Sequence, residues 1–402
     1  MRDGAPHPEG LGLYVSVPFC RAKCSYCNFA SGVFAESRMQ AYVDRLCAEI
    51  AGAGARATAM QAVLPQRVES IFFGGGTPSL LAPRHLRQIF FAIHKHFEVA
   101  EDAEITMECA PGQIADTVWM EMLAQGTNRI SFGVQSFVDA EAAAVGRKHT
   151  AEIVQAEIER VRSAGVRFIN VDLIAGLPHQ TAASWRHSLD AAVASGAGHI
   201  SVYMLEVDED SRLGREVLAG GVRYHAHFIP DEELTADLYL AACEHLERAG
   251  VLQYEISNFA RAGEESRHNL RYWLRQPYLG LGLDAHSMLR REDAETPAVR
   301  FANTDDLDRY IGGESVFAAL AAKVVPEFVT EHAATEERVF LGLRLNAGME
   351  RRELAACTGE DVLLELEAEG MLVFVAGRVR LSARGRLLSN EVFARLLEAV
   401  PA

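Results

Sequence analysis

Between Leu11 and Val207 the hydrophobic residues follow two alternating patterns. Short runs rich in β-branched and aromatic residues predict strands at LYVSV, VESIFF, AEITME, RISFGV, RFINVDLI and HISVYML. Stretches with helical spacing, such as HLRQIFFAIHKHF and AEIVQAEIERVRSAG, separate these runs. Strands and helices that alternate in this way build a parallel sheet from right-handed βαβ units.

The number of these units bears on the shape of the sheet. Six strand–helix repeats occupy Leu11 to Val207, whereas a full eightfold barrel usually needs about 250 residues. We therefore expect an α/β fold whose first domain, residues 1–225, is a partial, TIM-like (β/α)6 barrel.

The pattern changes after this barrel. Residues 226–330 are expected to form a helix-rich extension that carries the aromatic and glycine-rich stretch SRHNLRYWLRQPYLGLGLDAHS. Residues 331–402 predict three helices, a hairpin at MLVFVAGRVRLSARG and a last helix, which is the order of a winged helix. From Thr335 onward this part carries nine Arg against eleven Asp plus Glu. A DNA-reading module normally has a basic face, so we interpret the winged-helix-like domain as one that contacts protein.

Composition narrows the functional class. The 402 residues carry a formal net charge of −16, which disfavours general binding to nucleic acid or to an anionic membrane. No apolar run approaches the roughly 18 residues of a membrane span, and MRDGAPHPEG has no apolar stretch of a secretion signal. Seven cysteines are an odd number and few for a disulfide framework. We expect a cytoplasmic protein with reduced thiols, which would meet a membrane only through a partner; the oligomeric state stays open.

Three of the cysteines are clustered. Cys20, Cys24 and Cys27 form C-x3-C-x2-C directly after the first predicted strand. Structural zinc takes four ligands, and no fourth Cys or His lies in or beside this loop. A [4Fe–4S] cluster can instead be held by three cysteines, which leaves one iron open to a substrate or cofactor. The pattern favours the cluster, with zinc and three metal-free thiols as the alternatives.

Polar residues and glycines follow the predicted strands at their carboxyl ends, where ligands bind in parallel α/β folds. They are Gly75, Gly76, Thr77, Glu108, Gln135, Arg147 and Asp172. Glycines let the backbone approach a ligand closely. Two carboxylates, an amide and an arginine at one edge suit a zwitterionic ligand that also bears sugar hydroxyls.

On these motifs the sequence resembles the radical S-adenosylmethionine superfamily, and within it the anaerobic coproporphyrinogen III oxidase-like branch. The resemblance implies that Cys20, Cys24 and Cys27 bind a [4Fe–4S] cluster and that S-adenosylmethionine chelates the fourth iron. It also implies a set of cofactor contacts, namely Tyr14, Tyr26, Gly75, Gly76, Thr77, Glu108, Gln135, Arg147 and Asp172. Two positions depart from the branch: Ser16 stands where histidine is usual, and Cys109–Ala110 interrupts the usual E-x-N-P-G.

Two members of the branch differ near the cluster. The oxidative decarboxylase has a fourth cysteine two places after the third, where this chain has Phe29. The HemW-type heme chaperones lack that cysteine and carry H-N-x-x-Y-W, which matches His268 to Trp273 here. The sequence therefore resembles the HemW-type heme chaperones. This resemblance implies heme as a ligand and an acceptor protein that receives it.

A heme needs an apolar slot and usually an axial His, Cys, Met or Tyr. His268 is a candidate ligand beside Tyr272 and Trp273, and His286 in DAHS is a second candidate. The histidines of YHAHF, at positions 225 and 227, alternate as on a possible strand, and we interpret them as surface residues.

Three functions remain open at this point. The first is a heme chaperone, and the second is an oxygen-independent coproporphyrinogen III dehydrogenase or another radical enzyme acting on a tetrapyrrole. Phe29 in place of the fourth cysteine disfavours the dehydrogenase. The third is a non-catalytic interaction protein with a structural metal site. Whether S-adenosylmethionine is cleaved or only bound is left undecided by the sequence.

Overall fold

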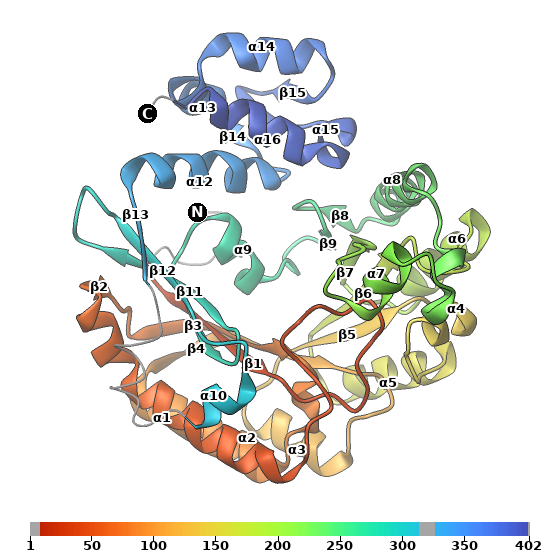
Figure 1. Cartoon of the computed structure of the whole chain (residues 1–402), viewed down its shortest axis with the longest axis vertical. Coiled ribbons are helices and arrows are strands. Elements are labelled where there is room, and N and C mark those ends of the chain that lie inside the picture. Colours follow the sequence, from red (N-terminus) through yellow and green to blue (C-terminus); the bar gives the residue numbers. More distant parts are fainter. Residues whose placement is uncertain (1–8, 313–325, 401–402) are drawn as a thin grey trace.

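The fold is described from a computed structural model, for residues 9–312 and 326–400 (Figure 1). All six strands expected in the first half are present and lie side by side, each parallel to the next. They are β1 (Leu11–Val17), β3 (Arg67–Gly75), β4 (Glu98–Cys109), β5 (Arg129–Gln135), β6 (Phe168–Ala175) and β7 (His199–Met204). The prediction of a partial, TIM-like barrel is confirmed.

Helices cover the outer face of this sheet, and Figure 1 shows the first of them along its convex side. They are α1 (Ser37–Ala59), the 3-10 turn η1 (Pro78–Leu80), α2 (Pro83–His96), α3 (Asp116–Ala124), α4 (Asp139–Ala144), α5 (Ala151–Ser163) and α6 (Ala182–Ala194). Helix α2 shows why these helices pack against the sheet. Its residues Leu86, Ile89, Phe90 and Ile93 form one buried apolar stripe at helical spacing.

Beyond the barrel strands, the extension adds its own strands to the same sheet. The helix α7 (Arg212–Leu218) and the 3-10 segment η2 (Arg223–Phe228) lead from the barrel into the extension, whose helices are α8 (Glu232–Arg248), α9 (Arg267–Trp273) and α10 (Leu307–Ile311). Its strands are β8 (Leu252–Gln253), β9 (Asn258–Ala260), β10 (Tyr278–Gly282), β11 (His286–Arg291), β12 (Ala298–Ala302) and β13 (Glu327–Val329). Residues 313–325 of the extension lie outside the described residues.

These strands continue the sheet at both of its edges. With β2 (Ala62–Val63) on β11, the described residues form a thirteen-stranded sheet in the order β13-β12-β11-β10-β1-β3-β4-β5-β6-β7-β9-β8. Strand β10 lies parallel to β1. The sequence pattern did not predict this strand, because glycine is uncommon in strands. At Gly280 a Cβ would lie 2.2 Å from the carbonyl oxygen of His286, so close pairing with β11 requires glycine there. The stretch YHAHF, considered as a possible strand, lies instead in η2.

The C-terminal part has the predicted winged-helix-like order and a core of its own. Its helices are α12 (Glu331–Arg344), α13 (Arg351–Thr358), α14 (Glu360–Ala368), α15 (Ala383–Leu387) and α16 (Ser389–Glu398), and its strands are β14 (Met349–Glu350), β15 (Leu372–Val375) and β16 (Arg378–Leu381). Val339, Leu354, Leu363 and Leu396 belong to this second core. The limits at 225 and 330 stay predictions.

In the part of the chain that the structure describes, no helix is both long enough and apolar enough to cross a bilayer.

Candidate functional site

The loop that carries the three cysteines leaves β1 at the carboxyl edge of the sheet and is held on several sides. Its two ends meet where the Cys20 N–H donates to the Gly32 carbonyl at 2.9 Å. In its middle, the Ser25 N–H donates to the Val145 carbonyl at 3.2 Å, and the Ser25 carbonyl accepts from the Leu213 N–H at 2.8 Å. The end of α4 and the start of α7 therefore clamp the loop in place.

All three thiols of this loop are partly exposed. Burial raises the pKa of the Cys20 thiol, and hydrogen bonds with the Ser31 and Thr77 hydroxyls oppose that rise. Among residues 9–312 and 326–400, no three Cys, His, Asp or Glu side chains are gathered into a ready-made metal site. The donor set is three thiols on one loop, which fits a cluster with an open iron better than a closed zinc tetrahedron.

Arg147 lies between the cysteine loop and the sheet. Its Nη2 donates to the Tyr26 hydroxyl at 3.4 Å, and the groups whose charges act on it include Cys24 and Asp172. Its Nε is buried and has no hydrogen-bond partner among the described residues. A Cβ on Gly133 would come within 2.6 Å of Nη2, so glycine makes the room that this side chain occupies. An unpaired, buried N–H at this edge fits an anionic group such as a ligand carboxylate.

The glycine-rich turn after β3 packs against the end of β1. The Gly76 N–H donates to the Val17 carbonyl at 2.8 Å, and the Thr77 N–H donates to the Phe19 carbonyl at 2.8 Å. A Cβ at Gly76 would lie 2.7 Å from the Val17 oxygen, and Gly75 has a φ of +96°, which favours glycine. The turn therefore presents bare backbone beside the cysteine loop.

Two carboxyl groups, Glu108 on β4 and Asp172 on β6, line one cavity beside this turn. Burial raises the pKa of Glu108 to about 8, and the charge of Asp172 adds to the rise, while the Gly75 N–H opposes it. Burial also raises the pKa of Asp172, against hydrogen bonds from Ser201, Asn170 and Ser131. The burial and the neighbouring carboxyl favour the protonated form of Glu108, whereas a cation beside it would favour the carboxylate.

Gln135 ends β5 in a conformation that is uncommon for a residue with a side chain. It is buried and has a φ of 72°, and the β5–β6 register shifts between Gly133 and Gln135. Its Nε2 would lie 3.2 Å from a Cβ at Gly133, which puts the amide beside the arginine described above. Backbone strain of this kind is concentrated at functional sites.

A cavity of about 220 Å³ lies on the concave face of the sheet, next to these groups. Tyr14, Glu108 and Asp172 line it, as do polar residues that the sequence analysis missed: Thr106, Arg129, Ser131, Asn170, His199 and Ser201. Asn170 connects several of them. Its Nδ2 donates to Asp172 Oδ1 and to Ser131 Oγ, both at 2.7 Å, and its Oδ1 lies 2.6 Å from His199 Nδ1. Polar residues at alternate positions of the buried runs RISFGV, INVD and HISV were the available signal.

The two departures from the family pattern fall on opposite sides of the strands. Ser16 lines a second cavity, of about 310 Å³, next to Gly75 and Phe29. Cys109 is buried in the main hydrophobic core, away from the site, and its Sγ donates to the Met107 carbonyl. The Cys109 side chain is therefore a packing feature, whereas Ser16 borders a cavity.

His268, one of the two predicted heme ligands, is buried and already bonded at both ring nitrogens. Its Nδ1 lies 3.0 Å from Ser70 Oγ and its Nε2 lies 2.8 Å from the Tyr272 hydroxyl. Burial lowers its pKa to about 3, so the ring is neutral, with one N–H and one lone pair. Binding iron would require breaking one of these hydrogen bonds, and the geometry fits a structural histidine.

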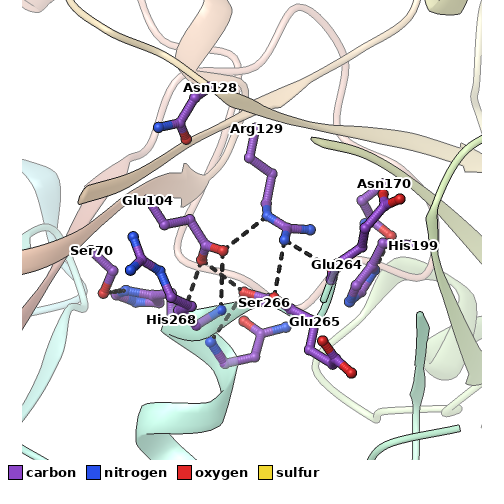
Figure 2. Close-up of polar contacts among 12 residues, drawn as sticks. Ser70, Glu104, Asn128, Arg129, Asn170, His199, Glu264, Glu265, Ser266 and His268 are labelled. Atoms are coloured by element: carbon purple, nitrogen blue, oxygen red, sulfur yellow. Dashed lines mark hydrogen bonds and ion pairs between the residues drawn. The ribbon is translucent and has the colours of Figure 1, made fainter. Parts of the chain in front are cut away.

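A buried ion pair holds the helix that carries His268. Figure 2 shows the Glu104 carboxylate facing Arg129, with an Oε2–Nε distance of 3.1 Å. The same carboxylate accepts the backbone N–H groups of Arg267 and His268, each at 3.0 Å, and the Ser266 hydroxyl at 3.2 Å. The pair thereby fixes the start of α9 across the concave face of the sheet.

His286, the second predicted heme ligand, is open to solvent. Its side chain is 71% exposed and lines the cavity of about 310 Å³ together with Tyr272, Tyr278 and Phe29. Asp284 is nearby, with Oδ1 3.9 Å from the histidine Nε2. Of the two predicted ligands, His286 is the one that can approach a bound iron without losing a hydrogen bond.

Comparison with known proteins gives two family matches within the chain. Residues 14–192 match the Radical SAM superfamily, and residues 329–388 match the HemN C-terminal domain. In solved structures, the coproporphyrinogen III oxidase HemN of Escherichia coli has the same fold, with a TM-score of 0.79 at 24% identity over 96% of this chain and 90% of that one.

Curated relatives match over nearly the whole length. A Bacillus subtilis protein named heme chaperone HemW is 32% identical over 96% of this chain and 98% of its own. The Mycobacterium tuberculosis protein of the same name is 32% identical over 98% and 96%. A Bos taurus mitochondrial radical S-adenosyl methionine domain-containing protein 1 is 30% identical over 98% and 88%.

Proposed function

The chain belongs to the HemW family of radical S-adenosylmethionine proteins, and we propose that it is a heme chaperone. In this proposal Cys20, Cys24 and Cys27 bind a [4Fe–4S] cluster, the carboxyl edge of the sheet binds S-adenosylmethionine, and heme is carried to an acceptor protein. The acidic charge and the sparse cysteines support a cytoplasmic location.

Different residues at the carboxyl edge of the sheet would contact different groups of S-adenosylmethionine. The glycine-rich turn offers backbone groups to the amino group, and Arg147, with its unpaired Nε, suits the carboxylate. In this proposal Glu108 and Asp172 lie near the positively charged groups of S-adenosylmethionine, and Gln135 and Tyr26 supply further contacts to it. When bound, the cluster and S-adenosylmethionine supply one-electron cleavage of the sulfonium, which yields a hydrogen-abstracting radical. The protein binds and orients the cofactor and excludes water, whether or not that cleavage occurs.

The observation that carries the chaperone proposal is the side chain at position 29. Phe29 is 62% exposed and lines the cavity of about 310 Å³ beside Ser16 and Gly75. A phenyl ring there offers an apolar surface, but it cannot donate a proton or bind a metal. The dehydrogenase alternative would use a thiol at this position, so the replacement supports carrying a flat apolar ligand over oxidising one.

Reconstitution with iron and sulfide tests whether the cysteine loop binds a cluster, against the alternative of a non-catalytic interaction protein. Anaerobic incubation with iron and sulfide should give the broad visible absorption of an iron–sulfur cluster, and Cys24→Ser should abolish it. Cys357→Ser is the matched control, because that cysteine lies in the C-terminal domain and should leave the absorption unchanged. Equal absorption in both variants would overturn the proposed ligands.

Two further measurements separate the chaperone from the dehydrogenase. Hemin added to the reconstituted protein should give a shifted Soret band that saturates. Reduced protein with S-adenosylmethionine and coproporphyrinogen III should leave the substrate unchanged, and decarboxylated product would establish the second function. Absence of the Soret shift would contradict the proposal that this protein carries heme.

A further inference from the structure

The segment from Asp208 to Phe228 is attached to the cysteine loop at one end and carries exposed apolar side chains at the other. Asn28 of the loop donates to Asp208 Oδ2 at 2.6 Å, and the Leu213 N–H donates to the Ser25 carbonyl. Farther along, Leu218 and Val222 are each 69% exposed, and Tyr224 and Phe228 are exposed too. Helix α7 and η2, which carry or flank these side chains, pack against each other, and contiguous exposed apolar side chains often mark an interaction site.

Three imidazoles surround the Phe228 ring, two from this segment and one from another part of the chain. The ring centroids of His179, His225 and His227 lie 4.1, 6.4 and 4.0 Å from that of Phe228. His179 comes from the loop after β6, and its backbone N–H donates to the Phe228 carbonyl at 3.0 Å. The segment is therefore fastened to the carboxyl edge of the sheet through this histidine.

Two of these histidines are hydrogen-bonded to each other. His179 Nε2 lies 2.9 Å from His225 Nδ1. Both residues have left-handed backbones, with φ values of 69° and 58°, and Tyr224 has a φ of 55°. Consecutive left-handed residues with side chains are costly, and such strain persists where the surrounding structure enforces it, often at binding sites.

The hydrogen bond determines what His225 can do. In the tautomer whose Nδ1–H donates to His179 Nε2, His225 keeps a lone pair on Nε2; this nitrogen has no hydrogen-bond partner in the described residues, and the side chain is exposed. A histidine held through one nitrogen, with the other free, is the usual arrangement of a metal-ligating imidazole. One such nitrogen is too few for a bare divalent ion, but it is sufficient for an iron that a porphyrin already supplies with four nitrogens.

We propose that His225, oriented by His179, is an axial ligand to heme iron, and that the porphyrin lies on the apolar surface formed by Leu218, Val222 and Phe228. This inference rests on the proposed heme-carrying function and gives it a location outside the two cavities. The heme would then lie on the outside of the molecule, where an acceptor protein can reach it. Its place next to the cysteine loop would let the state of the cluster influence the heme surface.

His225→Gly tests this ligand without endangering the fold, because glycine adopts a φ of 58° more easily than histidine does. Hemin titration of the reconstituted protein should show a changed Soret band and an affinity lower by at least about 10- to 100-fold, which is the loss typical when only the partner that orients a metal-binding histidine is removed. Added imidazole should restore the band, because it refills the position that the side chain left. Iron-free protoporphyrin IX should bind both proteins equally.

His187→Ala provides the matched control, since His187 is an exposed histidine on α6 and is not one of the histidines around Phe228. It should bind hemin as the unchanged protein does. His179→Gly should weaken hemin less than His225→Gly, because it removes only the orienting hydrogen bond.

The results separate this inference from the proposed function. If the unchanged protein gives no Soret shift, heme carriage itself fails. If it does and His225→Gly titrates identically, the assigned ligand is wrong while heme carriage stands. Loss of binding in His286→Ala with none in His225→Gly would move the heme to the cavity of about 310 Å³.

Discussion

The guanidinium of Arg344 lies over the indole of Trp273, with its central carbon 4.4 Å from the ring centroid. Arg344 belongs to α12 of the C-terminal domain, and Trp273 ends α9. Close by, Arg275 forms an ion pair with Glu337, also on α12. Since the Glu104–Arg129 pair holds the start of α9, this short helix links the concave face of the sheet to the C-terminal domain.

Trp273→Ala should loosen this link. A cation–π contact contributes about 0.5–2 kcal/mol, so we expect the free energy of unfolding to fall by at least that amount, with the C-terminal domain becoming easier to cleave by protease. Chemical denaturation and limited proteolysis measure both effects. Leu274→Ala is the matched control, because the neighbouring Leu274 is exposed and should change little. Equal effects of the two variants would contradict this role for the indole.

Breaking the Glu104–Arg129 pair should be costly. Removing one partner of a buried ion pair usually destabilises a protein by about 3–5 kcal/mol, because the other charge stays buried. Glu104→Gln should show this loss in denaturant melts. The double variant Glu104→Gln/Arg129→Met should recover part of it, and a double variant that is no more stable than the single one would show that the pair has no such coupling.

Glu108 should make stability depend on pH in a specific direction. Its pKa is raised to about 8 in the fold, against about 4.3 in an unfolded chain. Between these values the unfolded state loses the proton that the folded state keeps, so this group makes the protein less stable as pH rises through that window. Glu108→Gln should therefore stabilise the protein near pH 8 relative to its parent, with the difference vanishing below about pH 4.

Thermal melts of both proteins across that range measure the effect. Cys357→Ser retains Glu108 and serves as a comparison, so its difference in stability from the parent should not change with pH across that range. A difference between Glu108→Gln and the parent that does not change with pH would contradict the raised pKa.

Gly133→Ala should weaken binding of S-adenosylmethionine more than it weakens the fold. The added methyl group would meet Arg147 Nη2 at 2.6 Å and displace the guanidinium from the edge. We expect a loss of about tenfold in affinity, the size of one charge-assisted hydrogen bond. Equilibrium binding to the reconstituted protein measures it. Gly54→Ala is the control, since nothing lies within 4 Å of that position on α1, and it should instead stabilise the helix by about 0.5–1 kcal/mol.

His268→Gln should reveal a structural role. The histidine bonds Ser70 and Tyr272 inside the protein, and leaving such groups unpaired costs about 1–3 kcal/mol. We expect lower stability with hemin affinity unchanged. Ser70→Ala, which removes only one of the two bonds, should lose less. A lost Soret shift in a folded His268→Gln protein would return His268 to the heme ligands.

Local patterns were sufficient for much of the fold and for recognising the three-cysteine loop, whose role as a cluster site stays a prediction. The six parallel strands follow from short apolar runs between amphipathic helices, and the spacing of Cys20, Cys24 and Cys27 is a property of one loop. The strands after residue 252 were less visible, because β10 is rich in glycine and β8 and β9 are only two and three residues long. Their stability comes from neighbours in the sheet, which a local pattern does not contain.

The sequence by itself determined the barrel, the cysteine loop and the set of polar residues at the strand ends, because each of these depends on residues close together in the chain. Only the tertiary structure decided which side chains share a space. It joined His268 to Ser70 across almost two hundred positions, and it aligned Ser131, Asn170 and His199 along one cavity. It also brought His179 to His225. Contacts of this kind depend on how strands order and helices pack, and that order follows from burial of the whole core, which no single stretch of the chain encodes.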